Sequence, residues 1–369
     1  MSWLLDAASP PIQYRACAEI VPLHDRDPVQ LEGLRAAALD YKPAMAIARK
    51  QKASGLWDAN LLAPGPSKGY GWKEPGTIYQ YRRLLEFGWP ADQRPFRVAD
   101  RFLFQLLSRL EPDDPDPALA ARARELLVEF EKPAKSDPGL ARWARQLGRE
   151  AAAAALARAG HSQDPRLRGF ALKVATHVSL HLRSELAQKP FRRVKGKTVL
   201  GPGAFPPTIF AIEMLAFLPT LQRERSGFIE RLGAYLAVPT PKRAWMVVAG
   251  HKLFKPLFPV LGDPLGADAR GRVTDVPFAL YWIELLARLG LVRQVPSAAR
   301  TLARLLAECD AQGIWAPANL RAMPKSSNPL AAHYFPLEGA GRSPAQRQTD
   351  VTFRLALISK LIGLPIEVV

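Results

Sequence analysis

The feature that most constrains the fold is the spacing of apolar residues along runs rich in Ala, Leu, Arg and Glu. In 117–131 (PALAARARELLVEFE) and 140–160, apolar side chains recur every three or four residues, which is the spacing of one helix face. These residue types also favour helices intrinsically. Many of the 34 prolines stand just ahead of such runs, where a missing N–H costs little. Because no long alternation of apolar and polar residues suggests a sheet, we predict an all-α fold.

Four of the expected helices share one design, which indicates a degenerate repeat. Each has a turn, a small polar residue or Pro, an aromatic residue, an apolar helical stripe, and then Gly or Pro. They are 76–88 (GTIYQYRRLLEFG), 207–219 (PTIFAIEMLAFLP), 274–290 (TDVPFALYWIELLARLG) and 349–363 (TDVTFRLALISKLIG), with Tyr79, Phe210, Phe278 and Phe353 in equivalent places. Repeated helices of this kind cannot bury their apolar faces alone and must stack. The repeat therefore predicts a helical-repeat solenoid or a closed ring of paired helices.

We predict that residues 1–369 form a single helical-repeat domain. The Asp- and Pro-rich stretch 111–117 (EPDDPDP) is a candidate sub-boundary. Two longer stretches lack helical spacing: the basic segment 189–207, and 324–343. We expect both to be irregular loops.

The stretch 50–57 (KQKASGLW) carries a recognisable motif. Gln51, Gly55 and Trp57 reproduce the Q-x-x-x-G-x-W core of squalene-cyclase and prenyltransferase-type repeats, and 309–315 (CDAQGIW) is a weaker copy in which Cys replaces Gln. The chain resembles bacterial prenyltransferase-like or squalene-cyclase-like proteins. This resemblance implies an α/α toroid, with paired helices around a central cavity and inner-helix N-termini converging at one mouth. It does not extend to chemistry, because the D-x-D-D motif with which such cyclases protonate an alkene is absent.

The charge of the chain is strongly positive and unevenly distributed. Lys and Arg number 51 against 34 Asp and Glu, a net charge of +17. Residues 161–255 alone contain 16 Lys or Arg and 5 Asp or Glu. Such a concentration is expected of a surface that neutralises phosphates. We therefore predict a nucleic-acid partner, DNA in preference to RNA.

Several side chains are candidates for contact with that nucleic acid. Glycines beside a cationic cluster allow backbone N–H groups to approach phosphate, although a solvated loop without any contact is the alternative. The glycine-rich stretch GYGWKEPG and the segment 324–343 offer aromatic rings that could stack on a base, and a tyrosine that only anchors its loop is equally compatible. The candidates are Trp72, Lys73, Arg192, Arg193, Lys195, Lys197, Lys242, Arg243, Lys252, Tyr334 and Arg342.

Three acids are candidates for catalysis: Glu74, Asp275 and Asp350, each at the expected start of a repeat helix. In a toroid all three would lie around one mouth, where helix N-termini and Lys73 would lower their pKa values and keep them ionised. An ionised carboxylate can orient water or stabilise an oxocarbenium-like sugar. The alternative is that each acid only caps the N–H groups of its helix.

These features favour a DNA-binding helical-repeat protein, with activity of the DNA-glycosylase type on a normal or modified base in repair or phage defence. Such an enzyme needs an acid, aromatic rings around an extruded base, and cations on phosphates. One alternative is a terpenoid-cyclase- or prenyltransferase-like enzyme, or a binder of an apolar ligand in the toroid cavity. A second alternative is a non-enzymatic scaffold for an acidic partner.

The sequence gives no sign of a cofactor, a metal or a membrane span. We find no Walker A loop and no G-x-G-x-x-G after a strand, and His177 and His181 lack a third ligand. No apolar run approaches the roughly 18 residues of a spanning helix, and we see no signal peptide. Cys17 and Cys309 support no disulfide framework. We expect a cytoplasmic protein.

Overall fold

The computed structural model describes residues 2–57, 61–65, 74–108, 138–249, 252–255, 258–339, 341 and 343–366. Trp72, Lys73, Arg342 and the predicted segments 111–117 and 117–131 lie outside the described residues. The described chain is mostly helical, which confirms the predicted class. It divides into two compact units, and each is described by itself.

Unit 1 comprises Met1–Gln51, Tyr79–Pro95 and Leu265–Val369. Its elements are α1 (Ser2–Ala7), α2 (Pro10–Arg15), the π-helical turn η1 (Ala16–Ile20), the 3₁₀ turn η2 (Leu23–Asp25), α3 (Pro28–Leu39), α4 (Lys42–Arg49), most of α5 (Thr77–Glu86), α13 (Val276–Arg288), the 3₁₀ turn η5 (Val292–Gln294), α14 (Pro296–Ala307), the 3₁₀ turn η6 (Pro329–Ala331) and α15 (Pro344–Leu361).

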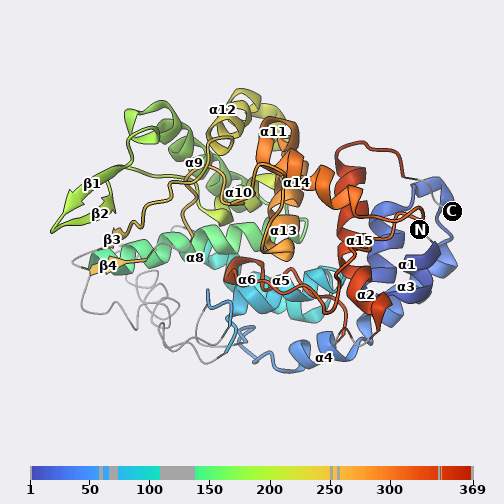
Figure 1. Cartoon of the computed structure of the whole chain (residues 1–369). Helices are drawn as coiled ribbons and strands as arrows, with labels where there is room; N and C mark the ends of the chain where they lie inside the picture. Colours follow the sequence, from blue (N-terminus) through green and yellow to red (C-terminus); the bar gives the residue numbers. More distant parts are fainter. Residues whose placement is uncertain are drawn as a thin grey trace. The chain divides into compact units, whose positions relative to one another are not determined.

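The core of unit 1 lies where α15 packs on α13, with α1 and η1 also against α15 (Figure 1). Every residue of α13 from Pro277 to Ala287 is buried. A helix that is apolar on all sides must be surrounded by other elements, so α13 is the central helix of this unit.

Unit 2 comprises Lys52–Ile78 and Phe96–Pro264. Its elements are most of α6 (Arg94–Leu107), α8 (Pro138–Arg158), α9 (Pro165–Arg183), the 3₁₀ turn η4 (Glu185–Ala187), β1 (Phe191–Val194), β2 (Lys197–Leu200), α10 (Ile209–Ala216), α11 (Pro219–Glu224), α12 (Ser226–Leu236), β3 (Val247–Ala249) and β4 (Lys252–Phe254).

The core of unit 2 is the packing of α8 on α10 (Figure 1). The run 151–157 of α8 (AAAAALA) is buried, and its small side chains allow a second helix to approach closely. All eight residues of α10 are buried as well. Helix α9 packs against α12 beside this pair.

Two β-hairpins add to the helices of unit 2, β1 with β2 and β3 with β4, both antiparallel. The prediction of an irregular loop over 189–207 is therefore wrong for the ten residues 191–200, which form the first hairpin. Its turn residues Lys195 and Gly196 both have positive φ, 47° and 74°, as in the tight turns that suit twisted strands. Segment 324–343 contains only the short turn η6 among its described residues.

Three of the four predicted repeat helices, 76–88, 207–219 and 274–290, correspond to α5, α10 and α13. The fourth is longer than predicted, since α15 begins at Pro344 and not near 349. Ser343 accepts the N–H of Gln346, and the Gln346 side chain accepts the N–H of Ser343. This capping box fixes the earlier start.

Both copies of the Gly-x-Trp motif form the same loop. In 52–56 and in 310–314, the first N–H donates to the last carbonyl oxygen, at 2.8 and 2.9 Å. In each loop the Gly N–H also donates to the first carbonyl oxygen, at 2.9 and 3.0 Å. Gly55 and Gly313 have φ values of 88° and 76°, which favour glycine. The weaker copy is thus a true structural copy of this turn.

The tryptophan of each copy docks on a threonine hydroxyl of a repeat helix. The Trp57 N–H donates to Thr77 Oγ1 (3.1 Å), and the Trp315 N–H donates to Thr352 Oγ1 (3.0 Å). Both indole side chains are buried. The local repeat therefore couples a turn to the helix that follows it, whereas the toroidal arrangement stays a prediction.

The shared threonine also sets the register of the repeat. Stretches 77–88 and 352–363 have the same length, begin at the docking Thr and end at a Gly with positive φ. In this register Ile78 corresponds to Phe353. The predicted equivalence of Tyr79 and Phe353 is therefore wrong by one residue.

Candidate nucleic-acid interface

A group of exposed cations lies in the β1–β2 hairpin of unit 2 and in the residues beside its two hairpins. Stretches 189–200 and 241–257 contain no Asp or Glu. Apart from Lys252, whose side chain is not described, every Lys and Arg in them is exposed. None forms an ion pair with another described residue. We call the exposed ones the basic platform: Lys189, Arg192, Arg193, Lys195, Lys197, Lys242, Arg243 and Lys255.

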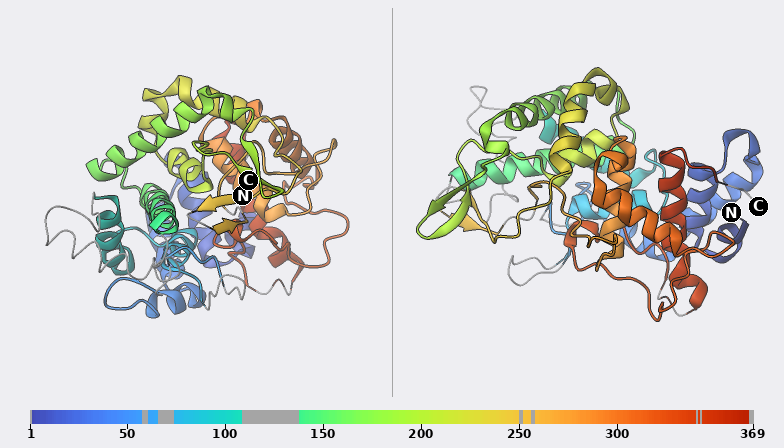
Figure 2. Two further views of the ribbon diagram at one scale, coloured as in Figure 1. Left: turned by 90° about the vertical axis from the view of Figure 1, so that its left-hand side faces the viewer. Right: turned by 45° about the horizontal axis from the view of Figure 1, so that its top comes forward.

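The β1–β2 hairpin holds four of these cations, Arg192, Arg193, Lys195 and Lys197, on its strands and turn. The β1–β2 register pairs Arg192 with Val199 and Arg193 with Thr198, so the two arginines extend to opposite faces of the ribbon. Val199 is fully buried and fixes one face against the rest of unit 2. The right-hand panel of Figure 2 shows the β1–β2 hairpin pointing away from the helices of unit 2.

The second hairpin is joined to the first by its approach segment. The N–H of Leu200 donates to Met246 O (2.8 Å), and the N–H of Met246 donates to Thr198 O (3.1 Å). The Phe191 and Trp245 rings lie 5.7 Å apart between their centroids. The two stretches are therefore joined by backbone hydrogen bonds and an aromatic contact, and the part predicted as an irregular loop is structured.

Asp275 is the N-cap of α13. Its Oδ1 accepts the N–H of Phe278 at 2.9 Å. Its Oδ2 accepts the hydroxyl of Ser326 and the N–H of Ser327, both at 2.9 Å, and the N–H of Asn328 at 3.2 Å. Both oxygens thus serve to hold segment 324–343 against the helix, as expected for a structural cap.

Asp350 does not lie at a helix N-terminus, contrary to the prediction. It is fully buried in the second turn of α15, where Oδ2 accepts the N–H groups of Leu337 and Glu338. Burial raises the pKa of Asp350, although the nearby guanidinium of Arg354 opposes this shift. A carboxylate without exposure cannot touch a bound nucleotide, so its catalytic assignment is wrong.

Glu74 is the predicted acid that the structure leaves exposed. It lies three residues before α5, in the part of the chain that belongs to unit 2. The basic platform belongs to the same unit. Among the three predicted acids, Glu74 is exposed, Asp275 is half-buried and Asp350 is buried.

Tyr334 was predicted as a base-stacking residue, and its position contradicts that role. It is fully buried, and its hydroxyl donates to Glu284 Oε2 at 2.7 Å. The Arg354 guanidinium lies 3.7 Å from the ring centroid. Burial raises the pKa of Tyr334 well above its ordinary value. Tyr334 anchors its loop, as in the alternative interpretation of a tyrosine that only holds its own segment.

The surroundings of Tyr334 contain a buried ionic cluster in unit 1. Arg354 donates to Glu86 Oε2 at 2.7 Å, and Arg15 donates to the same oxygen at 2.6 Å. Glu284 accepts from Tyr334 and lies 3.6 Å from Arg354. Glu284 and Arg354 each stand in a largely apolar helical stretch of the sequence, which indicates that they are buried but not with which charge they pair. The cluster ties α2, α5, α13 and α15 together.

A partly exposed His–Asp pair in unit 2 was missed by the sequence analysis. His161 Nε2 lies 2.9 Å from Asp100 Oδ2, and this hydrogen bond raises the pKa of His161. His161 follows Gly160, which ends α8 with positive φ. Nothing in the spacing of the two residues along the chain indicates their contact.

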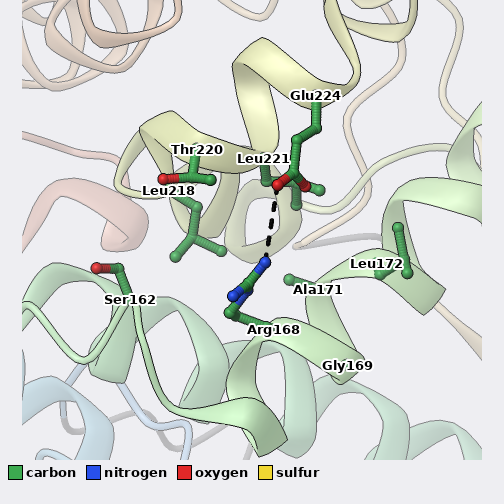
Figure 3. Close-up of a pocket in the computed structure, with 9 residues that line it drawn as sticks. All are labelled: Ser162, Arg168, Gly169, Ala171, Leu172, Leu218, Thr220, Leu221 and Glu224. Atoms are coloured by element: carbon green, nitrogen blue, oxygen red, sulfur yellow. Dashed lines mark ion pairs between the residues drawn. The ribbon is translucent and has the colours of Figure 1, made fainter.

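Ser162, the residue after His161, lines a small pocket between α9 and α11 (Figure 3). Arg168 and Glu224 face each other across it at 3.7 Å. Its volume is about 160 Å³, below the roughly 300–1,000 Å³ of most small-molecule sites. We therefore do not place the function in this pocket.

Neither a metal centre nor a membrane span appears in the described residues. No group of three or more His, Cys, Asp or Glu there could hold a metal ion. No described helix combines the length and the apolar character needed to cross a bilayer.

Comparisons with known proteins leave the basic platform as the principal guide to function. No protein-family model matches the chain, and no curated protein and no solved structure is significantly similar to it.

Proposed function

We propose that this protein binds nucleic acid, with DNA as its first partner, through the basic platform. The observation that carries the proposal is a structured, exposed set of cations without a single carboxylate in the same two stretches. Lys and Arg at a surface bind DNA by displacing the counterions of its phosphates. A hairpin can present such cations along the sugar-phosphate backbone of DNA while the helices of unit 2 hold the hairpin in place.

The first prediction concerns Arg192, Arg193, Lys195 and Lys197. Replacing all four with Ala should weaken binding to a fluorescent DNA duplex by at least tenfold at about 50 mM salt. Each lost phosphate contact should also lower the slope of log affinity against log salt by about 0.9. Fluorescence anisotropy over a salt series measures both quantities.

A matched control comes from α4 and the residues that follow it, where Lys42, Arg49, Lys50 and Lys52 are also exposed. Lys52 is the first residue assigned to unit 2, and its side chain points to solvent. Changing these four to Ala removes the same charge. Equal losses in both variants would show that net charge alone attracts DNA, and the platform would lose its role.

For catalysis we propose hydrolysis of an N-glycosidic bond, with Glu74 as the acid that orients water or stabilises the sugar cation. Its exposure and its place in the same unit as the platform support this assignment. A role in repair or in phage defence would suit such an enzyme. A bound base would have to leave the duplex stack to reach it.

The second prediction tests Glu74. Wild-type protein should convert DNA that carries damaged or modified bases into alkali-labile abasic sites, and Glu74→Gln should reduce the rate at least a hundredfold, within the usual contribution of a positioned acid or base. Binding affinity should change less than twofold. Asp350→Asn is the comparison, because that buried acid should affect folding and not the rate per folded molecule. An unchanged rate in Glu74→Gln would remove the catalytic assignment and leave the binding proposal intact.

The two alternative functions predict other outcomes. A scaffold for an acidic protein should be displaced from DNA by polyglutamate at equal charge concentration, whereas a phosphate-binding surface should strongly prefer DNA. A binder of an isoprenoid should be stabilised against heating by an apolar ligand. Binding of an isoprenoid would not involve the cations of the hairpin.

A further inference from the structure

Phe205 is unusual among the aromatic residues of this protein. Its side chain is 65 % exposed, and among the described residues it is the one aromatic side chain in the exposed class. Leu180 of α9 is 60 % exposed and precedes His181, which contacts the backbone of Phe205. An aromatic ring left in water gains free energy when another apolar or aromatic surface packs on it.

The backbone of Phe205 is held firmly despite the exposed ring. Its N–H donates to Nδ1 of the buried His181 at 3.3 Å. Pro206 and Pro207 follow and restrict the chain, and the carbonyl oxygen of Pro207 accepts the N–H of Val260 at 2.8 Å. An exposed ring on a fixed backbone loses little conformational freedom when something packs on it.

The loop that carries Phe205 begins at the base of the β1–β2 hairpin. The N–H of Gly201 donates to Pro190 O at 2.7 Å, directly beside Lys189 of the platform. Arg183, two residues after His181, is exposed as well. Cations therefore lie on both chain segments that hold the ring.

We infer that this surface takes single-stranded nucleic acid, with a base stacked on Phe205 and the adjoining phosphates on the platform. The inference rests on the proposed nucleic-acid binding and deepens it. A single strand offers both chemistries that the surface matches, negative phosphates and uncovered aromatic faces. A duplex hides the faces of its bases inside the stack. Stacking of bases on aromatic side chains beside a cationic path is a general mode of single-strand binding.

The experiment measures the affinity of three variants for a fluorescent oligonucleotide of about 20 residues, single-stranded and as a duplex. Phe205→Ala should weaken single-strand binding about 5- to 150-fold, the range for loss of one stacked base, and duplex binding less than twofold. Phe205→Trp should restore single-strand binding. Val238→Ala is the control, because Val238 is 60 % exposed in the same unit and carries no ring.

Three outcomes would overturn the inference. Unchanged single-strand affinity in Phe205→Ala would show that the ring contacts no base. Equal losses for the single strand and the duplex would place a general backbone contact there. A change in sedimentation, from a dimer in the wild type to a monomer in Phe205→Ala, would make a second copy of the chain the occupant. Absence of any nucleic-acid binding in the wild type would instead refute the proposed function itself.

Discussion

Lys195 occupies a backbone conformation that most side chains avoid. Its φ is 47°, and among the described residues it is the one non-glycine residue with positive φ. Left-handed backbone costs an ordinary L-residue roughly 1–2 kcal/mol, and Asn tolerates it better. The tip of the β1–β2 hairpin thus carries a cation at the expense of local stability. Such strain is common where a side chain serves binding.

The third prediction separates these two effects at one residue. Lys195→Asn should leave the free energy of unfolding unchanged or raise it by up to about 1 kcal/mol, while DNA affinity falls because one phosphate contact is lost. Urea denaturation and anisotropy measure the two quantities. Lys195→Arg keeps the charge and serves as the control for binding. Full DNA affinity in Lys195→Asn would show that the tip touches no phosphate.

The candidate acids show what single residues reveal in the sequence. Asp275 was placed correctly at a helix start, because Thr-Asp-Val-Pro combines a capping acid with an early proline. Asp350 stands in the similar run Thr-Asp-Val-Thr, but Ser343 and Gln346 start the helix earlier. The capping box was present in the sequence. The burial of Asp350 cannot be inferred from the sequence, because it depends on the segment that folds over α15.

At the scale of elements, the helices could be predicted and the hairpins could not. Apolar spacing marked α5, α10 and α13 over many residues. Strands β1 and β2 have four residues each, too few for an alternating pattern to stand out. Their turn uses Lys-Gly where Asn-Gly is the strong signal. The cations were identified from composition alone, and their ordered arrangement required the structure.

The fourth prediction concerns the two glycine turns of the repeat. A Cβ on Gly55 would lie 2.8 Å from the carbonyl oxygen of Val98, whereas a Cβ on Gly313 would meet nothing within 4 Å. Both positions have positive φ. Gly313→Ala should therefore cost about 1–2 kcal/mol of unfolding free energy from backbone strain, and Gly55→Ala should cost about 1–3 kcal/mol more from displaced backbone.

Urea denaturation, followed by circular dichroism and by limited proteolysis of each unit, measures the two costs. Gly33→Ala in α3 is the comparison without strain, since its Cβ also meets nothing within 4 Å and its φ is not positive; it should gain roughly 0.5–1 kcal/mol of unfolding free energy, because Ala favours a helix interior more than Gly does. Equal costs in Gly55→Ala and Gly313→Ala would mean that the contact with Val98 yields without penalty. The two loops would then differ only in sequence.

At the scale of the whole molecule, the charge distribution was the most informative property of the sequence. The segment 161–255 that holds the excess of cations lies entirely within unit 2. The buried ionic cluster of unit 1 could not be predicted, because its members lie far apart in the sequence. They are Arg15, Glu86, Glu284 and Arg354. Periodicity reveals which face of a helix is buried, and it does not reveal which distant helix supplies a counter-charge.

The division of the chain into units also fixes an order of events at the ribosome. Synthesis proceeds from the N-terminus, and α13 and α15 are among the last helices to emerge. Helices α1 and α2, which pack on α15, are among the first. Unit 2 is fully synthesised by Pro264 and can fold as a unit at that stage. The faces of α1 and α2 that pack on α15 therefore stay uncovered until residues 344–361, which form α15, have been synthesised.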